Sequence, residues 1–315
     1  MKQGKIVVVM GGPSSEAEVS RRTGAAIVSA LESKGYAVEG MELDPPHFAE
    51  AIRKSSCAIV FNALHGRYGE DGVLQGTLDM LGIPYTGSGV LAAAVTMDKV
   101  MSKRVFLGAG ISTPRSETFH RFEFDAELPS RIRKAFSLPV VIKASSQGSS
   151  IGVAIVEKEE ELESALKDAF RYDEEVLVEE FIRGKELTVA VWGDTREAQA
   201  FPVIEITTVS GRYDYASKYT KGASTHIIPA RIPLDVTERV QKLAVDAFRA
   251  CGCRGVARAD MMLGEDMTPY VIEINSMPGM TETSLVPDAG RAMGVEFPEL
   301  CEKILEMAGY KKQQD

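Results

Sequence analysis

The sequence predicts a parallel α/β domain at the N-terminus and α+β structure through the rest of the chain. Two observations lead to this fold class. Apolar strands alternate with amphipathic helices over the first hundred residues, and short strands with few helices follow. The chain has 315 residues, enough for two or three domains, and its apolar content of 44% can supply their cores.

The N-terminal domain is predicted from two strands, each followed by a helix. The first strand is KIVVVM, and helical apolar spacing continues over residues 17–33 until Gly35. The second strand is CAIVF, and DGVLQGTLDMLG then predicts a helix that ends at Gly82. Such alternation implies a parallel sheet with ligands outside the carboxyl ends of its strands.

The loop after the first strand, GGPSSEAEVS, resembles a phosphate-binding turn but carries acid. Glu16 and Glu18 stand in the first helical turn, where a phosphate would meet like charge. Ser15 and Glu18 have the S-x-x-E spacing of a capping box, which predicts a structural role for Glu18. Glu16 is left at the mouth of the loop. In the later turn LHGRYGEDG, His65 alone is compatible with a purely structural role.

The pattern changes after about residue 97. Short strands follow, namely PVVIK, GVAIV, VLVEE and ELTVAVW. The segment EKEEELESALKDAFRY predicts one helix among them, with Leu162, Leu166 and Phe170 on its apolar stripe. We expect a small, mostly antiparallel α+β domain with one covering helix.

Two segments of this second region are candidate nucleotide contacts. After Lys143, the stretch KASSQGSSIG leaves backbone N–H groups free to fold over phosphates, although a hairpin turn explains it equally well. The stretch VLVEEFIRGKE predicts a strand that runs into a hinge at Gly184.

Near the C-terminus a helix over 236–250 precedes two strands, GVARADMML and TPYVIEINSMPG. Because residues two apart in a strand face the same side, Arg258 faces with Asp260, and Glu273 with Asn275. If the strands pair, three oxygen donors converge, a set that suits Mg²⁺, while Arg258 suits a transferring phosphoryl group. The alternative is a salt-bridged sheet edge.

The segment 207–229 has no apolar periodicity and contains two lysines and three tyrosines. We expect it to lack regular structure and to close as a lid over an anion. The alternative is an ordinary surface loop.

Composition restricts partners and location. The net charge of −9 disfavours nucleic acid and anionic membranes as partners. No apolar run is long enough to cross a bilayer, and the first is too short for the core of a signal peptide. The cysteines are few, so we expect reduced thiols in a cytoplasmic protein; they are Cys57, Cys251, Cys253 and Cys301.

Together these stretches resemble one family, the D-alanine–D-alanine ligases of the ATP-grasp superfamily. The resemblance runs from Gly11 to about Leu285. It rests, in this order, on GGPSSEAEVS, NALHGRYGEDG, TGSG, MDK, QGSSIG, VEEFIRGKE, YDYASKY, RAD and EINSMPGMTETSL. It implies an ATP-grasp fold with an N-terminal α/β domain (1–97) that binds the first substrate, a central domain (98–187) and a C-terminal domain (188–315) with the lid.

The resemblance also implies the reaction. ATP phosphorylates the carboxylate of one D-alanine, and the amine of a second D-alanine attacks the acyl phosphate to form a dipeptide for peptidoglycan precursors. ATP would bind between the last two domains with two Mg²⁺, or Mn²⁺ in their place. A homodimer through the N-terminal domain is expected.

Motif positions then imply roles for single residues. The ATP contacts would be Lys99, Lys143, Glu179, Glu180, Phe181, Ile182, Glu186 and Lys218 of the lid. The metal ligands would be Asp260, Glu273 and Asn275, with Glu273 bridging. Arg258 and the Gly279 N–H would stabilise the tetrahedral oxyanion, and Ser284 and Leu285 would bind the second carboxylate. The first substrate would meet His65 at its carboxylate and Glu16 at its amine, and a trio of Glu16, Ser149 and Tyr219 would close the site.

Some alternatives stay open at this stage. Ala144 stands where the family often has proline, and SSQ precedes Gly-Ser-Ser, so the detailed shape of the phosphate loop is not determined. Tyr219 disfavours D-lactate as second substrate but does not exclude D-serine. A nucleotide-binding regulator without catalysis would be expected to lack a metal ligand or Arg258, and this chain has them all.

Overall fold

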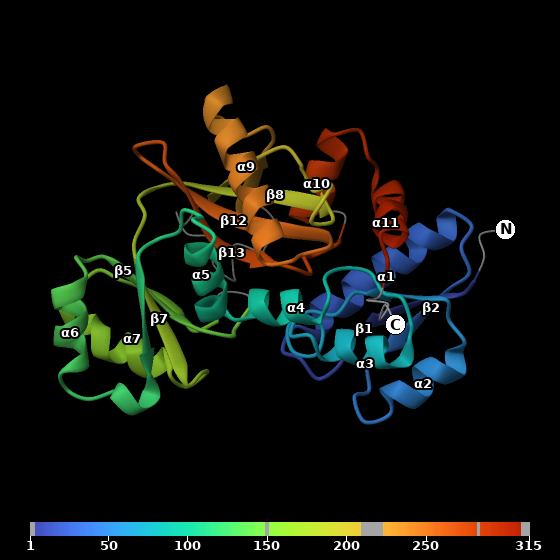
Figure 1. The fold of residues 1–315 in the computed structure, drawn as a ribbon, viewed down its shortest axis with the longest axis horizontal. Coiled ribbons are helices and arrows are strands. Elements are labelled where there is room, and N and C mark those ends of the chain that lie inside the picture. The colour runs from blue at the N-terminus through green and yellow to red at the C-terminus, as the bar shows by residue number, and fades with distance from the viewer. Residues whose placement is uncertain (1–3, 149–150, 209–222, 282–283, 310–315) are drawn as a thin grey trace.

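The computed structural model describes residues 4–148, 151–208, 223–281 and 284–309. Its described strands form three separate sheets, which follow one another along the chain from blue to red in Figure 1. The central sheet lies at one end of the elongated molecule, away from the other two.

The N-terminal sheet has the order β2-β1-β3 and is parallel, as predicted. Its strands are β1 (Ile6–Met10), β2 (Val38–Glu42) and β3 (Ile59–Asn62). The helices of this region are α1 (Ala17–Ser33), α2 (Phe48–Ser55), α3 (Val73–Leu81) and α4 (Val90–Met97). The predicted helix over 17–33 and the helix end at Gly82 are both confirmed; Gly82 has φ +67°, which glycine adopts without strain.

The central sheet is antiparallel in the order β4-β7-β5-β6. Its strands are β4 (Ser116–His120), β5 (Val140–Ala144), β6 (Val153–Val156) and β7 (Glu175–Glu180). Two α-helices cover it, α6 (Leu128–Ala135) and α7 (Leu162–Ala169), with short 3₁₀ turns at Arg121–Glu123 and Glu159–Glu161. The expectation of one covering helix was wrong. The sequence shows little apolar periodicity for α6, because this helix is only two turns long and buries just Leu128 and Ile132.

The C-terminal sheet has the order β11-β10-β8-β12-β13, with β9 on the side of β8. Its strands are β8 (Gly184–Gly193), β9 (Gln199–Ala200), β10 (Ile204–Thr208), β11 (Ser224–Ile227), β12 (Gly255–Gly264) and β13 (Pro269–Asn275). The other helices in the described part of the chain are α5 (Lys99–Gly108), α9 (Leu234–Ala250), α10 (Leu285–Ala292) and α11 (Phe297–Glu306).

Two expectations for this region need correction. ELTVAVW belongs to β8, which pairs along its full length with β12 rather than joining the central sheet, and the boundary expected after residue 187 falls inside it. The alternation of side chains along β8 would be the same in either sheet, so only its hydrogen-bonded partner strands show to which sheet it belongs. The segment 207–229 is not wholly irregular, because its ends complete β10 and form the antiparallel β11; residues 209–222 lie outside the described part.

The hydrophobic cores connect the sheets unequally. One core contains Ile6 and Ile27 together with Val256 and Ile304, so the N-terminal and C-terminal sheets are packed through shared side chains. The central sheet has a core of its own, formed by β-strand residues and by α6 and α7. The first and third sheets therefore form a common base to which the central sheet is attached.

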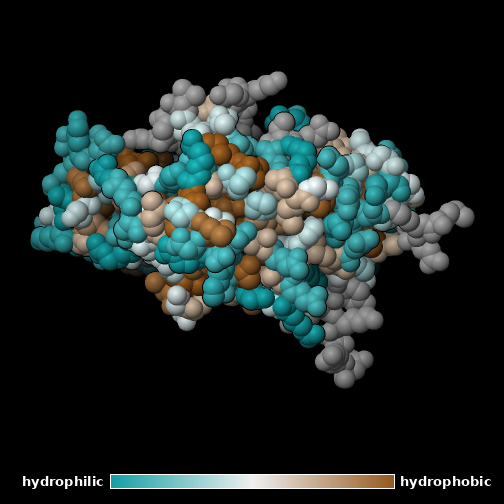
Figure 2. Space-filling model, turned by 90° about the horizontal axis from the view of Figure 1, so that it is seen from above, coloured by the Kyte–Doolittle hydropathy of each residue, from teal (hydrophilic) through white to brown (hydrophobic). Residues whose placement is uncertain are grey.

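The cysteines are free thiols, as predicted. Three are buried, and burial raises the pKa of Cys251 to about 12. Within the described residues, no helix is long and apolar enough to cross a membrane. On the face shown in Figure 2, hydrophilic residues in teal cover most of the surface, with hydrophobic residues in smaller groups between them.

A buried carboxylate makes the stability of the C-terminal sheet dependent on pH. Glu205 on β10 is 3% exposed, and it accepts hydrogen bonds from the Arg231 guanidinium at 2.7 and 3.1 Å. Hydrogen bonding to Arg231 is the main cause that lowers the pKa of Glu205 to about 2. Because the folded pKa is depressed, the stabilisation is complete above about pH 4.5 and is lost as the pH falls toward 2.

We expect Glu205→Gln to lower the free energy of unfolding at pH 7 by about 1–2 kcal/mol, since Arg231 is largely exposed and solvent screens the pair. Urea unfolding between pH 7 and pH 2 measures this. The variant should lose part of the wild-type decline below pH 4.5, whereas the exposed control Glu306→Gln should follow the wild type. An unchanged pH profile in Glu205→Gln would contradict the assignment.

Candidate functional site

The predicted oxygen donors do converge, because β12 and β13 are antiparallel neighbours. Arg258 lies opposite Asn275, and Asp260 lies opposite Glu273. The register shifts directly after Asp260, and the pairing then continues with Met261 opposite Val271. Directly opposite residues on one face have their Cβ atoms about 5 Å apart, which brings both carboxylates within reach of one small cation.

Arg258 and Asp260 form a two-pronged ion pair. The Nε of Arg258 donates to Oδ1 at 2.7 Å and an Nη to Oδ2 at 2.6 Å. Thr188 on β8 also donates its hydroxyl hydrogen to Asp260 Oδ1 at 2.7 Å. Thr188 carries no signal in the sequence, since it reaches Asp260 only because β8 pairs with β12.

The donor set fits magnesium. Two carboxylates and the Asn275 amide are hard oxygen ligands, and Asn275 Oδ1 accepts from the Met277 N–H at 3.0 Å, which orients it. Among residues 4–148, 151–208, 223–281 and 284–309, no cluster of three histidine, cysteine or acidic side chains could hold a metal. With two carboxylates and one amide, the set of Asp260, Glu273 and Asn275 suits a cation that keeps water and phosphate oxygens as further ligands.

Lys99 lies between the metal-ligand candidates and the serine-rich loop. It is the first residue of α5, whose N-cap Asp98 accepts from the Met101 N–H at 2.9 Å. Its Nζ donates to the Gln147 carbonyl at 2.6 Å and is 3.6 Å from Glu273 Oε2. The MDK motif thus holds a lysine at a capped helix start, beside both the loop and the acidic pair.

Lys143 and Glu179 face each other from neighbouring strands of the central sheet. Both side chains are buried, and Lys143 Nζ is 2.5 Å from Glu179 Oε2. A second buried lysine, Lys103 on α5, is 2.7 Å from the other oxygen of Glu179. Burial alone would raise the pKa of Glu179, but the ammonium groups of Lys143 and Lys103 outweigh it and hold that pKa below its usual value. Sequence reasoning missed Lys103, whose only signal was its helical spacing from Lys99.

The hinge between the central and C-terminal sheets carries the other candidate nucleotide contacts. Glu180 ends β7 and accepts from the Arg115 N–H at 2.7 Å. Phe181 and Ile182 follow, and they line an open cavity of 560 Å³ with Arg183 and Glu180. Glu186 lies on β8, paired with Met262 of β12. The predicted strand is β7, which ends at Glu180, and β8 begins at Gly184 after three residues without regular structure; a hinge here stays a prediction.

The glycine loop after β1 is not open for a phosphate. The Gly11 N–H donates to Ser20 Oγ at 2.8 Å, and the Gly12 N–H donates to Glu42 Oε1 at 3.1 Å. A side chain on Gly11 would collide with the Glu42 carboxylate at 2.1 Å. The protein thus supplies its own anion, Glu42, to the Gly12 N–H, and the Ser20 hydroxyl to the Gly11 N–H.

The predicted capping box of Ser15 and Glu18 is wrong. Helix α1 begins at Ala17, so its N-cap is Glu16, which makes no capping hydrogen bond with its side chain. A capping box needs the serine at the N-cap and the glutamate three residues later, and here both are displaced by one position. Glu18 is exposed and lies 3.6 Å from Arg21.

Glu16 projects toward the serine-rich loop. A Cβ atom on Gly66 would lie 2.8 Å from Glu16 Oε2, and one on Gly148 would lie 3.1 Å from the same oxygen. The carboxylate is therefore close to the His65 turn and to the central sheet at once. At Gly66 the backbone has φ +70°, a conformation that glycine adopts without strain.

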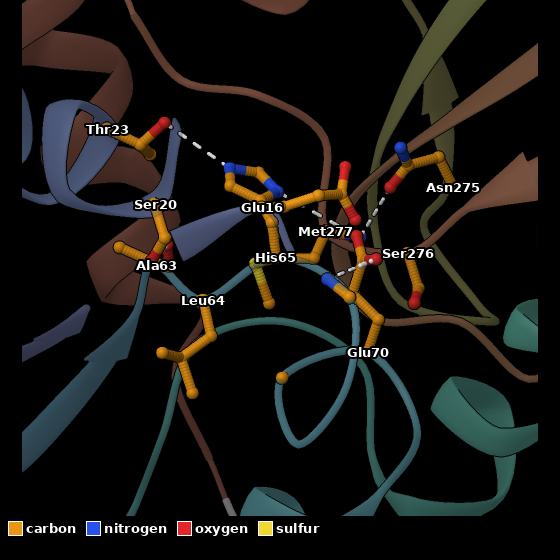
Figure 3. Close-up of polar contacts among 12 residues, drawn as sticks. Glu16, Ser20, Thr23, Ala63, Leu64, His65, Glu70, Asn275, Ser276 and Met277 are labelled. Atoms are coloured by element: carbon orange, nitrogen blue, oxygen red, sulfur yellow. Dashed lines mark hydrogen bonds and ion pairs between the residues drawn. The ribbon is translucent and has the colours of Figure 1, made fainter. Parts of the chain in front are cut away.

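His65 is buried and held from two sides. Its Nε2 is 3.3 Å from Thr23 Oγ1, and its Nδ1 is 3.9 Å from Glu70 Oε1. Figure 3 shows the contacts of His65, with the Glu16 side chain beside its ring. His65 also lines a small cavity together with Met277, which follows β13.

The start of α10 brings together the remaining candidates. Ser284 is the N-cap, and its Oγ accepts from the Thr281 N–H at 3.1 Å. A Cβ on Gly279 would lie 3.2 Å from that Oγ. Leu285 has its side chain in the shared core, so only its backbone is available to a ligand. Ser149, Lys218 and Tyr219 lie outside the described residues.

Comparisons with known proteins identify relatives of this chain. The family model described as the D-Ala–D-Ala ligase C-terminus matches residues 105–306, and the one for the N-terminus matches 40–88. A curated D-alanine–D-alanine ligase from Moorella thermoacetica is 49% identical over 96% of this chain and 99% of its own length.

Solved structures are similar over nearly the whole chain. The D-alanine–D-alanine ligase from Bacillus anthracis complexed with ATP has a TM-score of 0.83 at 33% identity and covers 97% of both chains. The VanG D-Ala:D-Ser ligase from Enterococcus faecalis has a TM-score of 0.82 at 31% identity and covers 97% of this chain and 99% of its own.

Proposed function

This chain belongs to the D-alanine–D-alanine ligase family, and we propose that its facing strands β12 and β13, together with Lys99 and the Lys143–Glu179 pair, form the site that joins two D-alanine molecules at the expense of ATP. The fold is ATP-grasp. The dipeptide serves peptidoglycan synthesis, and the reaction passes through an acyl phosphate. A free carboxylate is a poor acyl donor, so ATP activates it before the second amine attacks.

In the proposed site, ATP lies between the central and C-terminal sheets. Lys99 and Lys143 contact its phosphates, and the hinge residues Glu180 to Ile182 contact the adenine through their backbone. Mg²⁺ held by Asp260, Glu273 and Asn275 would offset the charge of the triphosphate during transfer. The observation that carries the proposal is the register that sets Asp260 opposite Glu273 beside Lys99.

Substrate positions follow from the remaining groups. Glu16 holds the ammonium of the first D-alanine, since its carboxylate lies near the His65 turn and the loop at Gly148. Arg258 and the Gly279 N–H stabilise the negative oxygen of the tetrahedral intermediate. Ser284 and the Leu285 backbone, at the start of α10, receive the carboxylate of the second D-alanine.

The direct test is phosphate release from ATP with Mg²⁺, using D-alanine, L-alanine, D-serine and D-lactate, with mass spectrometry of the products. We expect release that depends on D-alanine and D-alanyl-D-alanine as product. The absence of turnover with D-alanine would contradict the proposed function. A mixed dipeptide formed with D-serine would widen the range of accepted second substrates without changing the type of reaction.

Substitution of Glu16 and of Glu18, the two acids of the first loop, should have different effects on KM for D-alanine. We expect Glu16→Gln to raise KM for D-alanine about tenfold or more, because a charged partner of the ammonium is lost, with little change in KM for ATP. Glu18→Gln is the matched control: Glu18 is exposed, so both constants and the melting temperature should stay near wild type. The opposite pattern in the two variants would overturn this role for Glu16.

We also propose a homodimer in the cytoplasm. Its support is an exposed apolar surface on α3 and α4, where Met80 is 90% and Leu91 is 76% exposed. Sedimentation velocity should give a dimer that Met80→Glu/Leu91→Glu converts to monomer. A monomeric wild type at micromolar concentration would exclude this assembly.

A further inference from the structure

Lys103 is a buried cation that no step described so far uses. It lies on α5 one turn after Lys99 and is 3% exposed. A lysine is almost never buried to this degree unless its charge is paired. Its partner is Glu179 Oε1 at 2.7 Å, and the second carboxylate oxygen of Glu179 is taken by Lys143.

The ammonium of Lys103 is held by the protein on several sides. Besides its ion pair with Glu179, it donates hydrogen bonds to Thr113 Oγ1 at 2.6 Å and to the Pro114 carbonyl at 2.8 Å. Two of its three N–H donors are thus given to these oxygens, and its charge is paired with Glu179. Thr113 in turn donates to the Val271 carbonyl on β13 at 2.7 Å. Lys103 therefore links the start of α5, the hinge-side end of β7 and the strand that carries Glu273.

The charges of Lys103, Glu179 and Lys143 together determine how strongly Lys143 attracts a phosphate. If Glu179 were paired with Lys143 alone, the carboxylate would offset the ammonium charge and hold it away from a phosphate. With Lys103 on the other oxygen, the buried Lys103–Glu179–Lys143 row keeps one net positive charge. Burial lowers the pKa of Lys103, against the opposing effect of Glu179.

We infer that Lys103 is a positioning residue for ATP: by pairing with one oxygen of Glu179, it leaves a net positive charge at the Lys143–Glu179 pair that attracts the phosphates, while Lys103 touches no substrate itself. This inference rests on the proposed function, because it takes Lys143 as a phosphate contact. It adds a residue whose effect must pass through Glu179.

The first test is Lys103→Met in D-alanine-dependent phosphate release. We expect KM for MgATP to rise about tenfold or more, with KM for D-alanine within about twofold of wild type. Competitive inhibition by inorganic tripolyphosphate, which has no adenine, should weaken in parallel. An unchanged KM for MgATP, or an equal rise in both constants, would contradict the inference. Arg104→Met, on the exposed side of α5, is the matched control and should leave all three values unchanged.

A second comparison tests the route through Glu179. In a Glu179→Gln background, adding Lys103→Met should change tripolyphosphate inhibition less than about threefold, because the carboxylate that Lys103 restrains is already gone. A further loss of tenfold or more would show that Lys103 acts independently of Glu179 and would overturn the proposal.

The comparison of Glu179→Gln with the Glu179→Gln/Lys103→Met double variant also tests the inference if Lys103→Met alone does not fold, as judged by circular dichroism. In the Glu179→Gln background no buried carboxylate loses a partner when Lys103 is removed. Failure of the inference about Lys103 can be distinguished from failure of the proposed function. An inactive wild type with D-alanine refutes the ligase assignment, whereas an active wild type with an unaffected Lys103→Met refutes only the role of Lys103.

Discussion

Glu273→Gln is expected to lower kcat by about 10²- to 10³-fold while the fold stays intact. The carboxylate lies opposite Asp260 and 3.6 Å from Lys99, where it would help to hold the proposed Mg²⁺. Gln keeps the shape but loses the charge, and a bound divalent cation contributes several kcal/mol to the transition state, at about 1.4 kcal/mol for each factor of ten. Phosphate release at saturating ATP and D-alanine measures kcat.

The matched control is Glu238→Gln on the exposed side of α9, which should leave kcat unchanged. Thermal unfolding should place Glu273→Gln within about 0.5 kcal/mol of wild type, since the Glu273 side chain is about one-third exposed and its pair with Lys99 is long. Raising the Mg²⁺ concentration should recover part of the lost rate. Near-normal kcat at low Mg²⁺ would remove Glu273 from the proposed metal site.

Arg258→Lys is expected to have an effect of similar size for a different reason. Arginine fits the Asp260 carboxylate with two parallel N–H donors and is thereby aimed along the sheet face. Lysine keeps the charge but has no fixed fork, so it cannot hold Asp260 and point a donor at a developing oxyanion together. Loss of one such donor costs about 10²- to 10³-fold in kcat.

The kinetic pattern distinguishes this role from a binding role. Because the oxyanion forms only when the second amine attacks and is absent from the complex with bound substrates, kcat should fall while KM for MgATP changes by less than about threefold. Arg249→Lys, at the exposed end of α9, is the control and should behave as wild type. A large rise in KM for MgATP with unchanged kcat would assign Arg258 to ground-state nucleotide binding instead.

Several errors of the sequence analysis share one cause. The covering helix α6, the place of β8 and the ends of the 207–229 segment all depend on which distant strand or core a short stretch contacts. The capping box failed for a smaller reason: a spacing pattern holds only if the helix starts where the pattern requires, and α1 starts one residue later.

The amino-acid sequence by itself determined which side chains share a strand face and the order of the motifs. Local periodicity depends only on near neighbours, so the faces of Arg258 with Asp260 and of Glu273 with Asn275 could be predicted. The tertiary structure decided what lies opposite each face. Thr188 on Asp260, Glu42 on the Gly12 N–H and Lys103 on Glu179 join segments far apart in the chain. Such contacts are set by the packing of sheets and helices, and a buried charge finds its partner only when that packing is complete.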